Sequence, residues 1–194
     1  MCGRFELDAK AEVFKKRYKL KRPPAMPNTP EVRPTDLSVV VNGKREAVLL
    51  GWGFPSEWDG KPLFNARAET LADKPSFCPY LEQRCIVPAT AFFEWRKDGK
   101  DKLRNSISLD QSMMSFAGLC SETHFTIITC SASPTMARVH DRMPVILPAV
   151  AEDTWLDASL PFVSVSEVLV PYAGSDLCFD ETPAPVPPQG DLFG

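Results

Sequence analysis

Residues 37–50 read LSVVVNGKREAVLL, two runs rich in valine and leucine on either side of Asn42-Gly43. An Asn-Gly pair between two such runs is the strongest short-range signal for a β-hairpin. From residue 84 onward the chain continues this pattern of short apolar runs, separated by turns such as Asp98-Gly99. The runs are CIVP (85–88), AFFEW (91–95), LRNSISL (103–109), MMSFAGLC (113–120) and FTIITC (125–130). The sequence therefore predicts a fold dominated by antiparallel strands.

Helices are expected to be few and short. Residues 7–19 carry an apolar stripe at helical spacing, and residues 65–73 (NARAETLAD) and 133–140 (SPTMARVH) each predict a short helix. Strands and helices do not alternate as they do in βαβ units. We therefore expect an α+β fold, built as a single domain on an antiparallel or mixed, barrel-like β-sheet with several short helices. The residues of the stripe are Leu7, Ala11, Phe14 and Tyr18.

Length and composition narrow the class of protein. A chain of 194 residues suits one domain, which we place at residues 1–178. No apolar stretch approaches the ~20 residues of a membrane span, and no basic-plus-apolar leader opens the sequence. The six cysteines include no CxxC pair and are accompanied by only two histidines, so no metal site is expected. Reduced thiols predict a cytoplasmic protein without membrane contact.

Charge is divided unevenly along the chain, although the net charge is only −3. Residues 1–105 hold 20 Lys and Arg against 14 Asp and Glu, a balance of +6. Residues 106–194 hold 2 against 11, a balance of −9. Such a division can place one basic face on an acidic protein. It permits a polyanionic ligand but does not require one, since basic runs are usually solvated faces.

The second residue is a cysteine, Cys2, which becomes the amino terminus if Met1 is removed. Removal is normal when the second residue is small. An α-amine has a pKa of about 8, against about 10.4 for lysine, so at neutral pH it is far more often nucleophilic. It can form a Schiff base with an aldehyde, and the adjacent thiol can then close a stable thiazolidine ring. The alternative is that Met1 stays and the position of Cys2 is accidental.

Five segments in order carry a family resemblance. The chain resembles the SOS-response-associated peptidase family, also called abasic-site processing proteins, from residue 2 to about residue 160. It departs from the family pattern at residues 30–36 (PEVRPTD), where an N-x-A-P-T stretch is usual, and at Ala91, where glycine is usual. The matching segments are MCGRF (1–5), GWGFPSEW (51–58), NARAET (65–70), RCIVPATAFFEW (84–95) and VHDRMPVIL (139–147).

The resemblance implies a DNA-damage response enzyme that acts on abasic sites in single-stranded DNA without a cofactor. Such a protein crosslinks its amino-terminal cysteine to the aldehyde of the ring-opened sugar, and the adduct shields the lesion. The family name also records a peptidase-like activity. We expect a monomer in the cytoplasm, associated with the nucleoid when bound to DNA.

The resemblance also assigns catalytic roles to four residues. Cys2 matches the nucleophile, and Asn65 matches an asparagine that positions the amine or the sugar. Glu94 matches a catalytic carboxylate, and His140 matches a histidine suited to acid–base exchange at the imine. Each has a structural alternative. Glu94 could pair with an arginine, His140 could be structural, and Asn65 could cap a helix.

Six further residues match positions expected to contact DNA. Guanidinium groups pair bidentately with phosphates, and aromatic rings stack on bases. Trp52 and Phe54 could instead belong to the core, and Arg142 could pair with Asp141 or Glu94. The positions are Arg4, Arg67, Thr129 and Arg142 for the backbone, and Trp52 and Phe54 for the bases.

The last residues, 179–194, predict a proline-rich, flexible tail. Within it, QGDLF resembles the pentapeptide that binds the bacterial sliding clamp. Leu192 and Phe193 would fill an apolar pocket of the clamp and Gln189 would make a polar contact. The alternative is an ordinary frayed terminus.

Two other functions remain open from the sequence. A cysteine peptidase would use Cys2 to attack a peptide carbonyl, with His140 or Glu94 as the base. Only Met1 precedes Cys2, which counts against cleavage of a pro-segment as the main activity. A non-catalytic single-strand-binding clamp adaptor would keep its function after substitution of Cys2.

Overall fold

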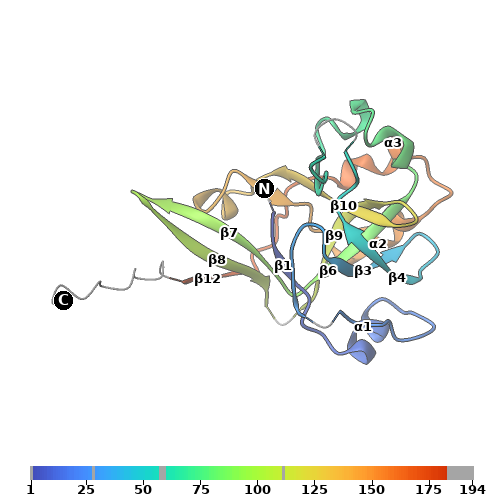
Figure 1. Cartoon of the computed structure of the whole chain (residues 1–194), viewed down its shortest axis with the longest axis horizontal. Coiled ribbons are helices and arrows are strands. Elements are labelled where there is room, and N and C mark those ends of the chain that lie inside the picture. Colours follow the sequence, from blue (N-terminus) through green and yellow to red (C-terminus); the bar gives the residue numbers. More distant parts are fainter. Residues whose placement is uncertain (1, 28, 57–59, 111, 183–194) are drawn as a thin grey trace.

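The computed structural model describes residues 2–27, 29–56, 60–110 and 112–182 of the chain. At its centre five strands form a closed barrel (Figure 1), in the order β10–β4–β3–β6–β9, with β9 pairing back onto β10. The β10–β4 pairing is parallel and the others are antiparallel. The predicted barrel-like α+β fold is confirmed. The strands are β3 (Leu37–Asn42), β4 (Ala47–Trp52), β6 (Arg84–Ala89), β9 (Met114–Cys120) and β10 (His124–Ser131).

A second, open sheet continues from the barrel, since its strand β7 follows β6 after a single residue, Thr90. Its strand order is β12–β8–β7–β1–β2, and the β7–β8 hairpin projects from the body of the molecule (Figure 1). Phe5 and Phe92 pair across β1 and β7, and both rings pack edge-on against Phe116 of the barrel. This aromatic contact fixes the sheet to the barrel. The strands are β1 (Phe5–Glu6), β2 (Glu31–Val32), β7 (Ala91–Asp98), β8 (Asp101–Leu109) and β12 (Leu177–Thr182).

Two short strands and several short helices complete the described part. Both strands, β5 (Asn65–Arg67) and β11 (Arg142–Pro144), pair with β10, β5 in parallel and β11 antiparallel. The α-helices are α1 (Ala11–Arg17), α2 (Ala149–Leu156) and α3 (Phe162–Val165). The 3-10 helices are η1 (Leu71–Asp73), η2 (Cys78–Tyr80), η3 (Met136–Arg138) and η4 (Ser166–Val168).

Three helix predictions need correction. The helix expected over residues 7–19 covers only Ala11–Arg17, because Leu7 N–H donates to the Pro30 carbonyl and Lys10 is still extended, with ψ 139°. Residues 65–73 form β5 and then η1, because β10 offers Asn65–Arg67 a strand partner that sequence periodicity does not reveal. Residues 133–140 contain only the single turn η3.

The hairpin of residues 37–50 is confirmed, with Val40 opposite Val48, but its turn is centred differently. Asn42 N–H donates to the Glu46 carbonyl, and the left-handed position, φ 59°, falls on Arg45. Gly43 has another reason to be glycine. A Cβ there would lie 3.3 Å from the carbonyl oxygen of Leu156, so α2 packs directly on this turn.

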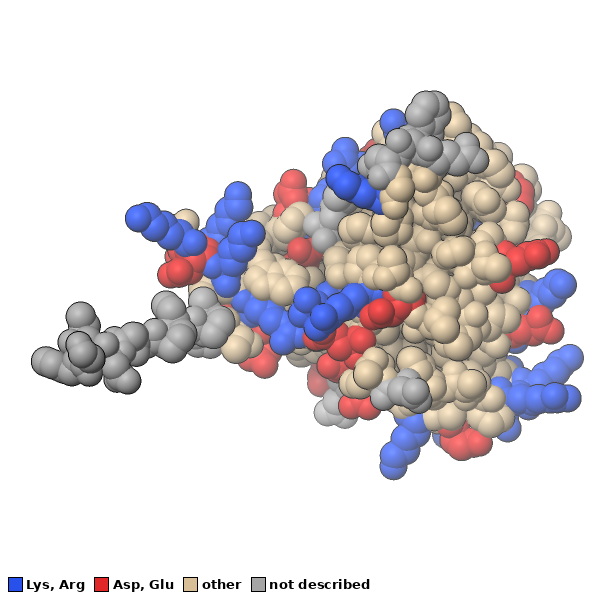
Figure 2. Space-filling view, viewed as in Figure 1, with Lys and Arg blue, Asp and Glu red and all other residues tan. Residues whose placement is uncertain are grey.

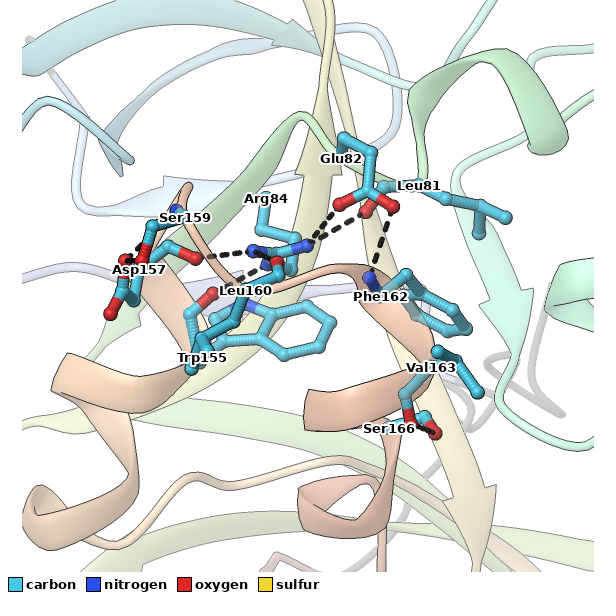
Figure 3. Close-up of polar contacts among 10 residues, drawn as sticks. All are labelled: Leu81, Glu82, Arg84, Trp155, Asp157, Ser159, Leu160, Phe162, Val163 and Ser166. Atoms are coloured by element: carbon cyan, nitrogen blue, oxygen red, sulfur yellow. Dashed lines mark hydrogen bonds and ion pairs between the residues drawn. The ribbon is translucent and has the colours of Figure 1, made fainter.

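Arg84 joins the barrel to the helices (Figure 3). Its side chain is only 2% exposed, and its five N–H donors all have acceptors. Glu82, one of those acceptors, also accepts the Phe162 N–H at 3.0 Å. The cluster therefore ties β6 to the end of α2 and the start of α3. The acceptors of Arg84 are the carbonyls of Leu81, Trp155, Asp157 and Leu160 and the carboxylate of Glu82.

The predicted boundary at residue 178 falls inside β12. Residues 179–182 pair with β8, with Glu181 opposite Asn105, so the sheet continues into the segment assigned to the tail. Gln189, Leu192 and Phe193 lie outside the described residues. Among the residues that are described, no helix is long and apolar enough to cross a membrane.

Candidate active site

Three strand pairings bring the predicted catalytic residues into one place. Cys2 precedes β1, and because Phe93 N–H donates to the Arg4 carbonyl, the amino-terminal segment runs beside β7, which carries Glu94. Asn65 begins β5, opposite Ile127 of β10. His140 lies just before β11, on the other side of β10. The four residues are distant in sequence, and β10 and β7 assemble them.

Cys2 is held firmly and is fully buried. Asn65 Nδ2 donates to the Cys2 carbonyl at 2.7 Å, and Cys2 Sγ donates to the Arg4 carbonyl at 3.7 Å. Burial, and next the negative charge of Glu94, raise the pKa of the Cys2 thiol to about 12. At neutral pH this thiol therefore keeps its proton.

Glu94 and His140 face one another in the candidate site. Glu94 is 4% exposed, and its Oε2 lies 3.9 Å from His140 Nε2. The backbone N–H of Arg142 donates to His140 Nδ1 at 3.0 Å, which leaves the ring proton of the neutral imidazole on Nε2, facing Glu94. Asp141 Oδ1 is also 2.9 Å from Nδ1, but the Asp141 side chain is 87% exposed. It can accept a hydrogen bond from Nδ1 only when the ring is protonated on both nitrogens.

A cavity of about 390 Å³ opens beside Glu94 and His140. Trp95, Lys97 and Lys102 complete its lining, and none of these three was singled out in the sequence. Lys97 lies directly opposite Lys102 across β7 and β8, and neither forms an ion pair in the part of the chain that is described. Like charges opposite one another destabilise a strand pair, so this pair favours an anionic ligand. The signal in the sequence was the turn at Asp98-Gly99, which sets that register.

The candidate phosphate-binding residues differ in availability. Arg67 is exposed, whereas Arg4 is half-buried, 5.4 Å from the centroid of the Trp95 ring and 3.5 Å from the Glu31 carboxylate. Arg142 is only 14% exposed and donates to both carboxylate oxygens of Glu69, at 2.6 and 2.9 Å. This guanidinium holds the pKa of Glu69 below its usual range. The partner of Arg142 is thus Glu69, neither Asp141 nor Glu94.

Thr129 lies behind Arg142. Its side chain is fully buried, and its Oγ1 donates to the Ala66 carbonyl at 3.4 Å. Arg142 Nη2 also donates to the Thr129 carbonyl at 2.8 Å. Thr129 therefore supports β5 and Arg142 from within the barrel.

Trp52 and Phe54 belong to the core, which corrects their expected role in base stacking. Trp52 is fully buried, stacks on Phe125 and donates its Nε1 proton to the Phe64 carbonyl at 2.8 Å. Phe54 is 3% exposed and packs on Tyr80 at 4.5 Å between ring centroids. Neither ring presents a free face, since Trp52 is the buried last residue of β4, and Phe54, beyond the end of β4, forms an isolated bridge with Leu63.

Comparisons with known proteins show the family and the fold of this chain. A family model described as SOS response associated peptidase (SRAP) matches residues 1–186. The abasic site processing protein YoqW of Bacillus subtilis is 35% identical, over 91% of this chain and 90% of that protein. The abasic site processing protein YedK of Escherichia coli is 28% identical, over 87% and 85%. A crystal structure of a Bacteroides thetaiotaomicron protein superposes with a TM-score of 0.82 at 26% identity, covering 93% of this chain and 91% of that one. The chain thus belongs to the SOS response associated peptidase family.

Proposed function

We propose that this protein processes abasic sites in single-stranded DNA by forming a thiazolidine crosslink through Cys2 once Met1 has been removed. The names of its relatives, abasic site processing proteins, support DNA with abasic sites as the substrate. The observation that carries the proposal is the convergence on Cys2. Asn65 holds its carbonyl at 2.7 Å, and the charge of Glu94 acts on its thiol.

The chemistry needs only the amino-terminal residue and an aldehyde. The α-amine attacks the aldehyde carbon, and loss of one water leaves an imine. The Cys2 sulfur then attacks the imine carbon, and the electron pair of the C=N bond moves to nitrogen, which takes up a proton. The proton of the thiol leaves for a nearby base. One water is released overall, and no electron is gained or lost.

Glu94 and His140 are suited to move these protons. Protonated Glu94 can donate to the sugar ring oxygen as the abasic ring opens, and again to the departing water. As a carboxylate it can take the thiol proton during ring closure. His140 faces it with Nε2 at 3.9 Å and can restore its protonation state between steps.

Basic side chains around the cavity suit the flanking phosphates. We assign Lys97 and Lys102, together with Arg4 and Arg67, to the DNA backbone next to the lesion. Arg142 is assigned a positioning role, since its guanidinium is occupied by Glu69 while its backbone N–H fixes the His140 ring. Contact of the tail with a sliding clamp stays a prediction from sequence.

The thiol pKa argues against the peptidase alternative. A cysteine nucleophile attacks as its thiolate, so such cysteines usually have lowered pKa values. Here burial raises the pKa of Cys2 to about 12, and the thiol hydrogen bonds to a backbone carbonyl rather than to His140. In crosslinking the thiol reacts only after the imine has formed, and we assign Glu94 to take its proton at that step.

The test uses single-stranded DNA with one abasic site. We expect wild-type protein to form a heat-stable, slowly migrating adduct, and intact mass to show loss of Met1. Cys2→Ala and Cys2→Ser keep the terminal amine but lack the thiol, so each should stop at an imine that is trapped only by borohydride. Cys178→Ser, which alters an exposed cysteine far along the chain, is the matched control and should crosslink normally. A heat-stable adduct from Cys2→Ala would contradict the mechanism.

A further inference from the structure

A second cavity lies between the loop after α1 and the β3–β4 turn. Its volume is about 660 Å³, and its two walls are residues 19–25 and 44–48. Figure 1 places α1 at the lower end of the molecule, away from the amino terminus and the β7–β8 hairpin. In Figure 2 basic side chains gather at the lower right, beyond α1. The cavity is therefore separate from the amino-terminal site.

The lining of this cavity, which we call the basic cavity, is strongly cationic. Five of its residues carry a positive charge and only Glu46 carries a negative one. Arg45 pairs with Asp153, but the other four cations form no ion pair within the described part of the chain. Several arginines elsewhere in the described chain are neutralised by carboxylate partners. The positive charge of the basic cavity is not neutralised in this way. The five cationic residues are Lys19, Lys21, Arg22, Lys44 and Arg45.

Backbone strain is concentrated in the same place. Among the described residues, three that are not glycine have a left-handed backbone, and two of them, Lys19 (φ 53°) and Arg45 (φ 59°), line the basic cavity. Both occupy positions where glycine is ordinarily found, Lys19 after a helix and Arg45 in a hairpin turn. Keeping a cation there costs free energy that glycine would save. Such strain persists most often at functional sites.

The end of helix α1 does not account for this cluster. A basic residue after a helix is favoured by the helix dipole, which explains Lys19 alone. Lys44 and Arg45 lie in a β-turn, so the dipole of α1 does not favour a positive charge at either position. The opposite wall includes Pro23 and Pro24, whose fixed φ angles stiffen the loop, so the cavity is formed before any ligand arrives.

We propose that the basic cavity binds closely spaced phosphate groups, those of a nucleic-acid strand that extends beyond the amino-terminal site. Cations from two elements, on a preformed concave surface, suit several phosphates held at once. The choice of nucleic acid rests on the proposed function. A free polyphosphate offers the same chemistry and is the other source to be tested.

The experiment compares two variants that remove the same charge. Lys21→Gln with Lys44→Gln neutralises one exposed lysine on each wall, and Lys10→Gln with Lys74→Gln neutralises two exposed lysines outside the cavity. Binding of an undamaged single-stranded oligonucleotide is measured against salt concentration. Log K falls as log [salt] rises, and for the cavity variant the loss of two phosphate contacts should make this slope shallower by about 1.4. The control should keep the wild-type slope.

A second arm titrates inorganic tripolyphosphate. Weaker DNA binding by the cavity variant alone supports a nucleic-acid site. Unchanged DNA binding with loss of tripolyphosphate binding supports a phosphate site filled by a free polyphosphate. If the two variants behave alike in both arms, the basic cavity is only a solvated surface and the proposal is overturned. Undamaged DNA has no aldehyde, so this result is independent of whether Cys2 crosslinks.

Discussion

Two buried polar clusters on consecutive strands are built in opposite ways. Around Arg84 on β6, all five N–H donors of the guanidinium are used (Figure 3). Around Cys2, next to β7, some buried polar atoms have no hydrogen-bond partner among the described residues. They include Asn65 Oδ1 and Arg142 Nε. Buried polar groups in proteins are normally satisfied, so the two clusters differ in how completely their hydrogen bonds are made. We therefore expect the first cluster to serve stability and the second to serve the proposed chemistry.

The largest expected effect is the loss of stability in Arg84→Ala. The substitution leaves the carbonyls of Trp155, Asp157 and Leu160 without their donor, and each buried acceptor left unsatisfied costs about 1–3 kcal/mol, so we expect a loss of about 3 kcal/mol or more. Urea denaturation should show this as a lower free energy of unfolding. The rate of crosslinking by the protein that remains folded should be unchanged.

Arg33→Ala is the control for that measurement. Arg33 pairs with Glu31, but its side chain is 60% exposed, so its removal should cost less than ~1 kcal/mol. If Arg84→Ala were no more destabilising than Arg33→Ala, the satisfied cluster would not be the stabilising one.

Glu94→Gln should show the reverse pattern. Amide nitrogen and oxygen cannot exchange protons with the substrate, so the rate of adduct formation should fall about 10²-fold or more, while the free energy of unfolding changes little. Single-turnover kinetics with an excess of protein measure the rate. Glu152→Gln is the matched control, a carboxylate 5% exposed that accepts hydrogen bonds from Arg17 and Ser115. It should lose stability and keep the rate, and a similar profile for both variants would remove the distinction between the clusters.

How much of the fold the sequence could predict depends on how far apart in the sequence the interacting residues lie. The hairpin of residues 37–50 was predicted because its signal is local. A barrel-like sheet was predicted as well, but the pairings of β10 with β4 and β9 that close it were not, because pairings between distant segments leave no periodic trace. For the same reason β5 was predicted as a helix. Trp52 was assigned to DNA through the family resemblance, with the core as the alternative, and its burial beside the strand partner Phe125 shows that it is interior.

The residues of the candidate site could be named from the sequence, but their contacts could not. A resemblance carried by short motifs identified Cys2, Asn65, Glu94 and His140 together, although nothing in the spacing of the four shows that they meet. The partners were missed. Arg142 pairs with Glu69, and Lys97 faces Lys102. Both contacts follow from strand register, which the sequence specifies only through the whole fold.

The smallest effect tests whether the Arg84 cluster depends on pH. The Phe162 N–H, and then Arg84, lower the pKa of Glu82 from its ordinary value of about 4.3. A carboxyl whose pKa is lower in the folded state contributes stability above its ordinary pKa, and this is lost as the pH falls through its lowered value. Glu82→Gln should therefore be less stable than wild type at pH 7 and approach it at pH 3.

The side chain of Glu82 is 60% exposed, so the difference at pH 7 should stay below ~1 kcal/mol. Other carboxylates titrate in the same range, so only the difference between the two urea curves at each pH is informative. If that difference did not depend on pH, Glu82 would not contribute as a charge. Arg84 would then stabilise β6, α2 and α3 through the backbone carbonyls alone, and the cluster would depend on its neutral hydrogen bonds, in contrast to a site that depends on the charge of Glu94.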